Sequence, residues 1–210
     1  MKNIAIFASG DGSNFKSIHR NVQSGNIPGR IALTASNNPD SGAIEYARDY
    51  NIPTLIINKI SHPDPPDLEE FLINTLAKNK IDLICLAGYM KLLPKNVVHQ
   101  YQYRILNIHP ALLPLFGGKG YYGIKVHEAV IASGAVESGV TVHFVDEEYD
   151  HGKIIAQEKV EIGANDTPET LAAQILQVEH ALYPQVVKAF CEDRIVWENN
   201  QPIIEFAIES

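Results

Sequence analysis

Apolar runs alternate with amphipathic stretches along the first half of the chain. Four runs are short and almost wholly apolar, which is typical of strands buried on both faces of a parallel sheet: residues 4–8, 30–35, 54–57 and 82–87. Three stretches between them carry apolar side chains at helical spacing: residues 15–23, 41–50 and 67–78. This alternation predicts an α/β fold with a doubly wound, mostly parallel sheet of Rossmann-like layout and right-handed crossovers.

The second half of the chain departs from this alternation. A helix is predicted at 124–132, and strands at 139–146 and 153–162 are joined by a short acidic loop, which predicts an antiparallel hairpin extension of the sheet. Thr167 and Pro168 mark the cap and first turn of a long helix. Its buried face is expected at six apolar positions: Leu171, Ile175, Val178, Leu182, Val186 and Phe190. Two short strands are expected to follow, at 195–197 and 203–206.

The segment 104–114 ends a strand with two polar side chains on one face. Leu106 and Ile108 alternate with Asn107 and His109, and Pro110 cannot continue the strand as a donor. Both polar side chains should therefore lie at the carboxyl end of the strand, where open α/β sheets bind ligands. An amide beside an imidazole can polarise a carbonyl while the ring moves protons, although a satisfied core pair is the more common fate. Spacing does not select a carboxylate partner from four acids in one loop: Asp146, Glu147, Glu148 and Asp150.

A glycine-rich turn, residues 9–14, connects the first strand to the first helix. Such a turn presents backbone N–H groups and the positive end of the helix dipole, which predicts a phosphate site. A dinucleotide fingerprint is not complete, because Phe15 stands where the third glycine would be needed, and residues 36–38 lack the acidic ribose partner. The alternative, a Ser or Asn helix cap without a ligand, stays open.

Two further segments flank these candidate sites. Residues 88–94 follow the fourth strand at the same sheet edge as the glycine turn, and their Met and Leu side chains are either core or the apolar wall of a pocket for a flat ring. Residues 115–123 hold four glycines within seven positions, which predicts a mobile loop that is either a lid or a surface insertion.

Composition narrows the functional classes. The 210 residues include 25 Asp and Glu against 17 Lys and Arg, a formal net charge of -8, which disfavours a nucleic-acid partner. No 18 consecutive residues are apolar, so no membrane partner is expected. Cys85 and Cys191 lie far apart and are expected to be reduced, which leads us to predict a cytoplasmic protein.

The eight histidines do not predict a metal centre. None lies at convincing metal-ligand spacing from a companion Cys or carboxylate, so no metal is predicted. His127 and His143 are candidates either to line a site or to satisfy a core hydrogen bond. The others are expected at helix surfaces, caps, turns or loops: His19, His62, His99, His151 and His180.

Five motifs together resemble one enzyme family. They are Ser9-Gly10-Asp11-Gly12-Ser13-Asn14, Leu86-Ala87-Gly88-Tyr89-Met90, Leu106-Asn107-Ile108-His109-Pro110, Val142-His143-Phe144-Val145 with Asp150 shortly after it, and Glu179-His180-Ala181-Leu182-Tyr183-Pro184. In these motifs, and over essentially its full length, the chain resembles the folate-dependent phosphoribosylglycinamide (GAR) formyltransferases. The resemblance implies one formyltransferase domain over 1–210, with a phosphate- and GAR-binding half at 1–100 and a catalytic and folate-binding half at 101–210.

The resemblance also implies a reaction and its site residues. The formyl group of 10-formyltetrahydrofolate, the co-substrate, would pass to the amine of GAR and give formyl-GAR and tetrahydrofolate in de novo purine (IMP) biosynthesis. Catalysis is assigned to Asn107, His109 and Asp150, and GAR binding to Gly12, Ser13, Asn14 and Glu179. Folate binding is assigned to Met90, Lys91, Leu92, Leu93, Asn107, Val145 and Asp146. The partners implied are these small molecules, for a monomer or homodimer.

The implied chemistry needs no covalent enzyme intermediate. The Asn107 amide and a protonated His109 would stabilise the oxyanion, and Asp150 would raise the pKa of the His109 ring. The nearest alternatives share this Asn-His-Asp chemistry: formyltetrahydrofolate deformylase, or a formyltransferase that acts on tRNA or on a sugar nucleotide.

Overall fold

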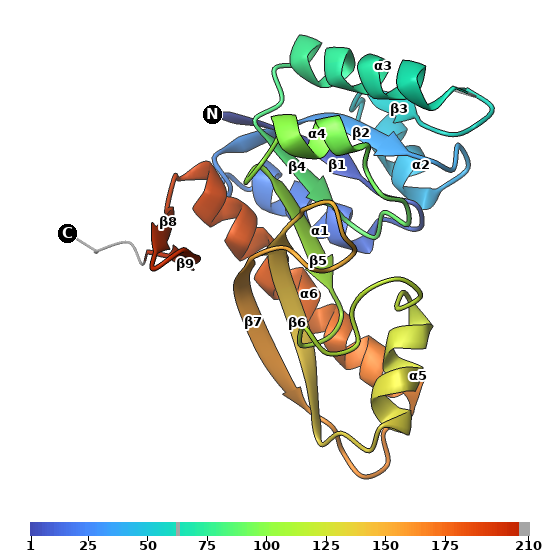
Figure 1. Ribbon diagram of the computed structural model, residues 1–210, viewed down its shortest axis with the longest axis vertical. Coiled ribbons are helices and arrows are strands. Elements are labelled where there is room, and N and C mark those ends of the chain that lie inside the picture. The colour runs from blue at the N-terminus through green and yellow to red at the C-terminus, as the bar shows by residue number, and fades with distance from the viewer. Residues whose placement is uncertain (62–63, 206–210) are drawn as a thin grey trace. The chain divides into compact units, whose positions relative to one another are not determined.

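Parallel strands form the core of the first half of the chain in the computed structural model, which describes residues 1–61 and 64–205 (Figure 1). Strand β1 (Lys2–Phe7) pairs in parallel with β2 (Gly29–Ser36) and with β4 (Leu83–Leu86). Strand β3 (Thr54–Ile56) pairs in parallel with β2. Most of β1 and all of β4 are buried, which explains why these strands are continuous apolar runs in the sequence.

Four helices belong to the same half: α1 (Ser13–Gln23), α2 (Gly42–Asp49), α3 (Pro65–Lys78) and α4 (Lys95–Gln100). Helix α2 is capped by Ser41, whose hydroxyl oxygen accepts a hydrogen bond from the Ile44 N–H at 3.4 Å. The predicted helices are confirmed, but α1 begins at Ser13 rather than at Phe15. Ser13 and Asn14 carry no apolar signal, so the hydrophobic pattern could not include them in the helix.

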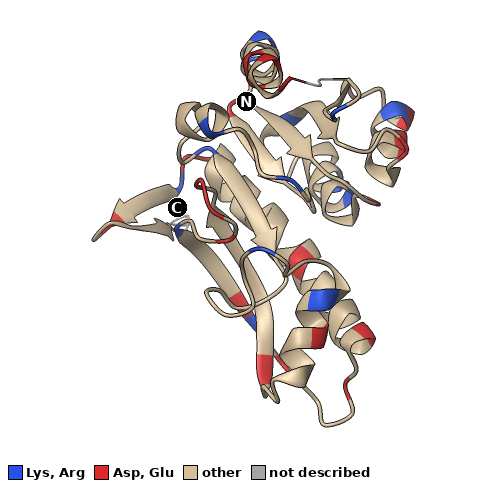
Figure 2. Cartoon of the chain, turned by 45° about the vertical axis from the view of Figure 1, so that its right-hand side comes forward, with Lys and Arg blue, Asp and Glu red and all other residues tan. Residues whose placement is uncertain are grey.

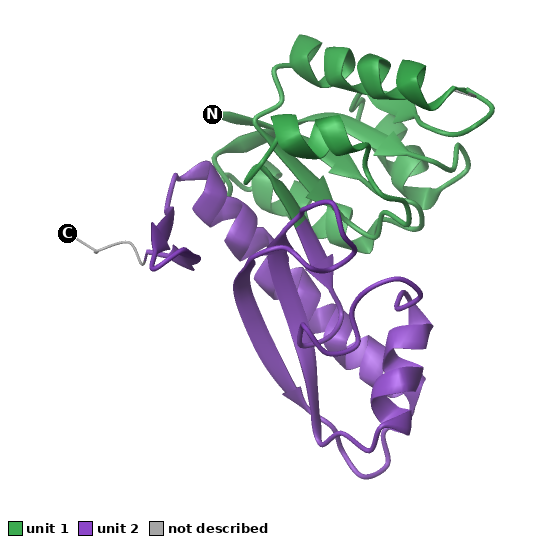
Figure 3. Ribbon diagram, viewed as in Figure 1, with its two compact units in different colours: residues 1–106 green, residues 107–210 purple. Residues whose placement is uncertain are grey.

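The chain divides into two compact units, residues 1–106 and 107–210 (Figure 3). Strand β5 (Ile105–His109) crosses this boundary. The strand order of the seven-stranded sheet is β3-β2-β1-β4-β5-β6-β7, which confirms the predicted α/β fold with a mostly parallel sheet. The predicted functional halves, 1–100 and 101–210, stay a prediction.

Unit 2 contains the antiparallel part of the fold. Strands β6 (Glu137–Phe144) and β7 (Ile154–Glu161) pair as the predicted hairpin, and helices α5 (Ile124–Ala132) and α6 (Pro168–Cys191) belong to the same unit. Strands β8 (Ile195–Glu198) and β9 (Gln201–Ile204) form a separate antiparallel pair. The predicted last strand included Phe206, which lies outside the described residues.

The buried face of α6 differs from the predicted one. Val178, Leu182 and Phe190 are only partly buried. Glu179 and Tyr183 are buried instead, and they continue the buried face along the helix. The prediction followed apolar residues, and a buried carboxylate gives no apolar signal. The start of α6 is as predicted, because the Thr167 hydroxyl accepts the Thr170 N–H at 3.3 Å.

Positions occupied by charged residues are distributed over the elements of both units (Figure 2). Acidic and basic positions are interspersed along the helices and strands, in keeping with the absence of long runs of one sign in the sequence. Along residues 1–61 and 64–205, Lys and Arg positions therefore alternate with acidic positions, unlike the continuous basic stripe that follows a nucleic-acid backbone.

Candidate active site

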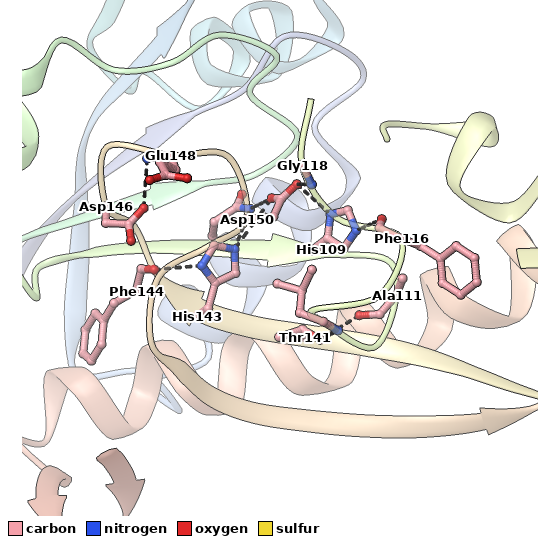
Figure 4. Close-up of polar contacts among 12 residues, drawn as sticks. His109, Ala111, Phe116, Gly118, Thr141, His143, Phe144, Asp146, Glu148 and Asp150 are labelled. Carbon is pink, nitrogen blue, oxygen red and sulfur yellow. Dashed lines mark hydrogen bonds and ion pairs between the residues drawn. The ribbon is translucent and has the colours of Figure 1, made fainter. Parts of the chain in front are cut away.

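The carboxyl end of β5 carries Asn107 and His109, as predicted, and the strand ends at His109 because Pro110 follows. The Asn107 side-chain nitrogen donates to the Asp150 Oδ1 at 3.2 Å and lies 3.1 Å from the His143 Nε2. The His109 Nδ1 lies 3.5 Å from the Asp150 Oδ2. The structure therefore brings Asn107, His109 and Asp150 together. His143 is a fourth member of the cluster and lies beside Asp150 (Figure 4).

His143 holds one defined tautomer. Its Nδ1 lies 2.7 Å from the Phe144 carbonyl oxygen, which can only accept, so Nδ1 carries the hydrogen. Its Nε2 is then free to accept from the Asn107 amide. His143 is almost fully buried and lies beside Asn107 and Asp150, so it satisfies a core hydrogen bond and also borders the candidate site.

The two hydrogens of the Asn107 amide are both engaged. One is donated to the His143 Nε2 and the other to the Asp150 Oδ1. These contacts fix the amide plane relative to the carboxylate. An Asn107 hydrogen bond to a substrate oxygen must therefore replace one of these two bonds.

Asp150 is surrounded by hydrogen-bond donors and rings. Its Oδ2 accepts the Gly118 backbone N–H at 3.0 Å, in addition to its contacts with Asn107, His109 and His143. Burial by itself raises the pKa of the carboxyl, but His143, His109 and the Gly118 N–H together lower it below its usual range. Asp150 is therefore ionised at neutral pH. Its φ of 54° lies in the left-handed region, a conformation that functional sites often contain.

His109 is held from both sides of its ring. Its Nε2 donates to the Phe116 carbonyl oxygen at 2.8 Å, and its Nδ1 faces Asp150. Burial lowers the pKa of His109 by more than Asp150 and the Phe116 carbonyl raise it. Asp150 raises the pKa of the ring, as expected, but burial acts in the opposite direction and is the larger effect. Desolvation outweighs the carboxylate and favours the neutral imidazole.

The loop 115–123 contributes main-chain groups to this cluster. The Phe116 carbonyl contacts His109 and the Gly118 N–H contacts Asp150, so the start of the loop belongs to the site rather than to a remote surface insertion. Phe116 has a φ of 55°, which is strained for a bulky residue. Main-chain contacts of this kind leave no signal in the side-chain pattern, and sequence reasoning missed both residues.

The glycine turn of unit 1 presents the N-terminus of α1 without a side-chain cap. Gly12 is the N-cap residue, with a φ of 70°, and no side chain caps the helix. A Cβ on Gly12 would lie 2.9 Å from the Ala43 Cβ, so only glycine fits there. No Ser or Asn side chain therefore caps α1, contrary to the capping alternative. The start of the helix keeps the arrangement expected of an anion site.

The turn is also linked to the segment that follows β4. The Ser9 hydroxyl accepts the Met90 N–H at 2.9 Å and donates to the Asn37 side-chain oxygen. The Ser9 N–H donates to the Gly88 carbonyl oxygen at 3.1 Å. The prediction that residues 88–94 leave β4 at the edge of the glycine turn is therefore confirmed.

Comparison with known proteins decides the family. Residues 2–187 match the family model described as formyl transferase. The chain belongs to the formyltransferase family. The resemblance inferred from the motifs is thereby confirmed, since the phosphoribosylglycinamide formyltransferase of Arabidopsis thaliana is 50% identical over 206 residues, or 97% of this chain and 70% of the relative. The enzyme of Bacillus subtilis is 38% identical over 188 residues, or 90% of this chain and 94% of the relative.

Solved structures of formyltransferases share the fold. Glycinamide ribonucleotide transformylase 1 from Symbiobacterium toebii is 35% identical with a TM-score of 0.89, covering 97% of this chain and 94% of that one. Phosphoribosylglycinamide formyltransferase from Coxiella burnetii is 36% identical with a TM-score of 0.88, covering 97% and 93%. A formyltetrahydrofolate deformylase from Pseudomonas syringae, only 24% identical with a TM-score of 0.85, shows a shared fold alone.

The relatives overturn one prediction. The expectation of a cytoplasmic protein is wrong, because the relatives from Arabidopsis thaliana and Vigna unguiculata, 50% and 49% identical, are chloroplastic. Cys85 and Cys191 are both buried thiols outside any disulfide, but reduced thiols do not distinguish one reducing compartment from another. In the described part of this formyltransferase, no helix is both long and apolar enough to span a membrane.

The predicted folate residues of this formyltransferase lie in two segments. In unit 1, Met90, Lys91 and Leu92 are exposed, whereas Leu93 is buried. In unit 2, Val145 and Asp146 begin the loop that leads to Asp150. The carboxylate of Asp146 is engaged within that loop, where its Oδ1 accepts the Glu148 N–H at 2.9 Å and its Oδ2 lies 2.7 Å from the His151 Nδ1.

Glu179, the predicted ligand of the glycinamide end of GAR, lies on α6 and is 8% exposed. A carboxylate at a buried helical position requires polar partners. Within residues 1–61 and 64–205, no group of three His, Cys, Asp or Glu side chains has the geometry to hold a metal ion.

Proposed function

We propose that this chain transfers the formyl group of 10-formyltetrahydrofolate to the amine of GAR, and that Asn107, His109 and Asp150 carry out the transfer. The products are formyl-GAR and tetrahydrofolate, in de novo purine (IMP) biosynthesis. The activity follows from the family and from relatives named as phosphoribosylglycinamide formyltransferases at 50% and 38% identity. The cluster of Asn107, His109, His143 and Asp150 is the observation that supports the assignment of the residues.

The reaction forms one C–N bond and breaks another. The GAR amine attacks the formyl carbon, the carbonyl oxygen becomes an oxyanion, and the bond from that carbon to the folate nitrogen then breaks. The donors available for the oxyanion are the Asn107 amide and the His109 Nε2–H. In the structure these hydrogens are held by His143, Asp150 and the Phe116 carbonyl, so binding of the formyl oxygen exchanges existing hydrogen bonds for stronger charge-assisted ones.

Proton transfer from the attacking nitrogen to the leaving folate nitrogen proceeds through His109 or through a water. The lowered pKa of His109 supports a neutral ring that can accept a proton at Nδ1. That nitrogen faces the Asp150 Oδ2 at 3.5 Å, so the proton would arrive beside an ionised carboxylate. Asp150 thus stabilises the imidazolium as it forms, and no covalent enzyme intermediate is required.

We assign the residues that bind GAR and folate from observations made within each unit. In unit 1, the uncapped start of α1 fits a phosphate, and we assign the GAR phosphate to Gly12, Ser13 and Asn14. In unit 2, we assign the glycinamide end to Glu179. We assign the folate to the segments already described: Met90, Lys91, Leu92, Leu93, Asn107, Val145 and Asp146.

A direct assay of the acceptor tests this function. The purified chain is incubated with 10-formyltetrahydrofolate, with and without GAR, and the folate product and formyl-GAR are quantified. We expect tetrahydrofolate and formyl-GAR in equal amounts, and folate turnover only when GAR is present. Formyl loss that does not depend on GAR would instead identify a deformylase, with water as the acceptor. Absence of any GAR-dependent turnover would contradict the proposal.

A further inference from the structure

The only tryptophan of the chain stacks on the end of strand β6. Trp197 lies on β8, and its ring is nearly parallel to that of Phe144, with an interplanar angle of 10° and 6.0 Å between centroids. Phe144 is buried, whereas Trp197 is 41% exposed. The β8–β9 hairpin lies beyond residues 2–187, the part of the chain that the family model matches.

Phe144 holds both ends of one loop. We define the site loop as residues 145–152, which contain Val145, Asp146 and Asp150. The Phe144 N–H donates to the Lys153 carbonyl oxygen at 2.8 Å, which closes the base of the site loop. Gly152 approaches so closely that a Cβ there would collide with the Phe144 carbonyl. The position of Phe144 therefore sets where the site loop begins and ends.

Phe144 also orients the reacting cluster. Its carbonyl oxygen accepts the Nδ1–H of His143 at 2.7 Å (Figure 4). The opposite nitrogen of that ring accepts a hydrogen of the Asn107 amide. The Oδ1 of Asp150, at the end of the site loop, lies 3.8 Å from the same His143 nitrogen. One residue thus connects the stack with Trp197 to the amide, the imidazole and the carboxylate.

The hairpin that carries Trp197 is itself fixed within unit 2. The Arg194 guanidinium donates to the Glu205 carbonyl oxygen at 2.7 Å and pairs with Glu192, just after the end of α6, at 2.6 Å. The Glu205 N–H donates in turn to the Arg194 carbonyl oxygen at 2.9 Å. The hairpin also contacts β7 through β9. These contacts fix the position of the hairpin, so Trp197 can restrict the movement of Phe144.

We propose that the β8–β9 hairpin braces the site loop, and that Trp197 is a positioning residue for formyl transfer. This inference rests on the proposed function, since it takes the folate to bind at the site loop. Trp197 stacks on Phe144 and acts on the reacting groups through it. Without the stack, Phe144 and the site loop have more conformational freedom. Folate binding must then order the site loop, and the entropic cost weakens the binding of folate. The loss therefore appears in the KM for folate rather than in the KM for GAR.

Two substitutions of Trp197 test the brace. Steady-state kinetics with both substrates varied are measured for Trp197→Ala and Trp197→Phe, at a temperature at which circular dichroism shows both variants folded. For Trp197→Ala we expect the KM for folate to rise by about fivefold, the order expected from loss of one aromatic pair, with the KM for GAR unchanged. Trp197→Phe keeps a stacking ring and should restore the KM for folate.

Val196→Ala is the matched control. Val196 precedes Trp197 on β8, so its side chain points to the opposite face of the strand, and its loss removes apolar area without removing the stack. We expect this variant to keep the wild-type KM for folate. A Trp197→Ala enzyme with unchanged KM for folate, or a Trp197→Phe enzyme as impaired as Trp197→Ala, would overturn the brace. Failure of the proposed function is recognised separately, because the wild-type chain itself would then show no GAR-dependent turnover.

Discussion

At the residue scale, Asn107 sets the strictest condition on the mechanism. Both hydrogens of its amide are donated, one to the His143 Nε2 and one to the Asp150 Oδ1. An oxyanion carries more charge than an imidazole nitrogen, so it competes well for one of these hydrogens. The amide is therefore oriented before reaction, and the exchange of one bond accompanies formation of the oxyanion.

Asn107→Ala removes this donor. We expect kcat to fall by about a hundredfold, as in comparable sites that lose one oxyanion donor, because the interaction strengthens only as charge develops. The KM for GAR should change little. Steady-state kinetics of the variant checks the prediction, and a kcat within experimental error of wild type would contradict it.

Gly12 permits a second prediction at this scale. Gly12→Ala places a Cβ against Ala43 at a φ of 70°, which displaces the start of α1. We expect the KM for GAR to rise on the order of tenfold, the effect of losing one or two amide bonds to phosphate. Gly25→Ala is the matched control: its φ of 77° carries the same backbone strain, but no atom lies within 4 Å of the added Cβ. An equal effect of both substitutions would refute a specific role of Gly12.

At the element scale, strand ends were the most predictable feature and main-chain contacts the least. Alternation and Pro110 placed Asn107 and His109 correctly at the end of β5. The choice of Asp150 among neighbouring acids needed the family resemblance, because all of these acids lie in one loop. The contacts of Phe116 and Gly118 are made by backbone atoms, which no side-chain pattern encodes. Burial of Glu179 on α6 was unpredictable because it opposes the hydrophobic pattern.

Thr141 on β6 ties that strand to the segment that follows β5. Its buried hydroxyl donates to the Ala111 carbonyl oxygen at 2.6 Å and accepts the Leu113 N–H at 3.0 Å, and Gln157 also donates to it. Thr141→Val keeps the shape of the side chain but removes the hydroxyl that the Ala111 carbonyl, the Leu113 N–H and the Gln157 amide bind. We expect the free energy of unfolding to fall by about 2 kcal/mol in chemical denaturation. Thr54→Val, at an exposed position of β3, should be close to neutral; equal effects would count against the network.

At the scale of the whole molecule, buried histidines couple stability to pH. Burial lowers the pKa of His19, His109 and His127 below the ordinary value of 6.5. As the pH falls below 6.5, the unfolded chain binds protons that the folded chain does not, so the folded state loses stability. His151 acts in the opposite direction, because Asp146 raises its pKa, but it is exposed and its pair is screened by solvent.

We therefore expect the Tm to decrease as the pH is lowered through 6.5, and to be constant above it until other groups titrate. Calorimetry or circular dichroism across this range measures the effect. The lowered pKa of Asp150 does not contribute there, since its stabilisation is lost only as the pH falls below its ordinary value of 3.8. A Tm that rises on acidification through 6.5 would show that the buried rings do not control stability.

The central claim is that Asp150 acts on the reaction and not on GAR binding, and Asp150→Asn tests it most directly. The kcat of this variant is compared with its Kd for GAR from calorimetry, beside Glu158→Gln, a loss of charge at an exposed position of β7. We predict that Asp150→Asn lowers kcat by on the order of a hundredfold or more, with the Kd for GAR unchanged, and that Glu158→Gln changes neither. Wild-type kcat in Asp150→Asn would contradict the account.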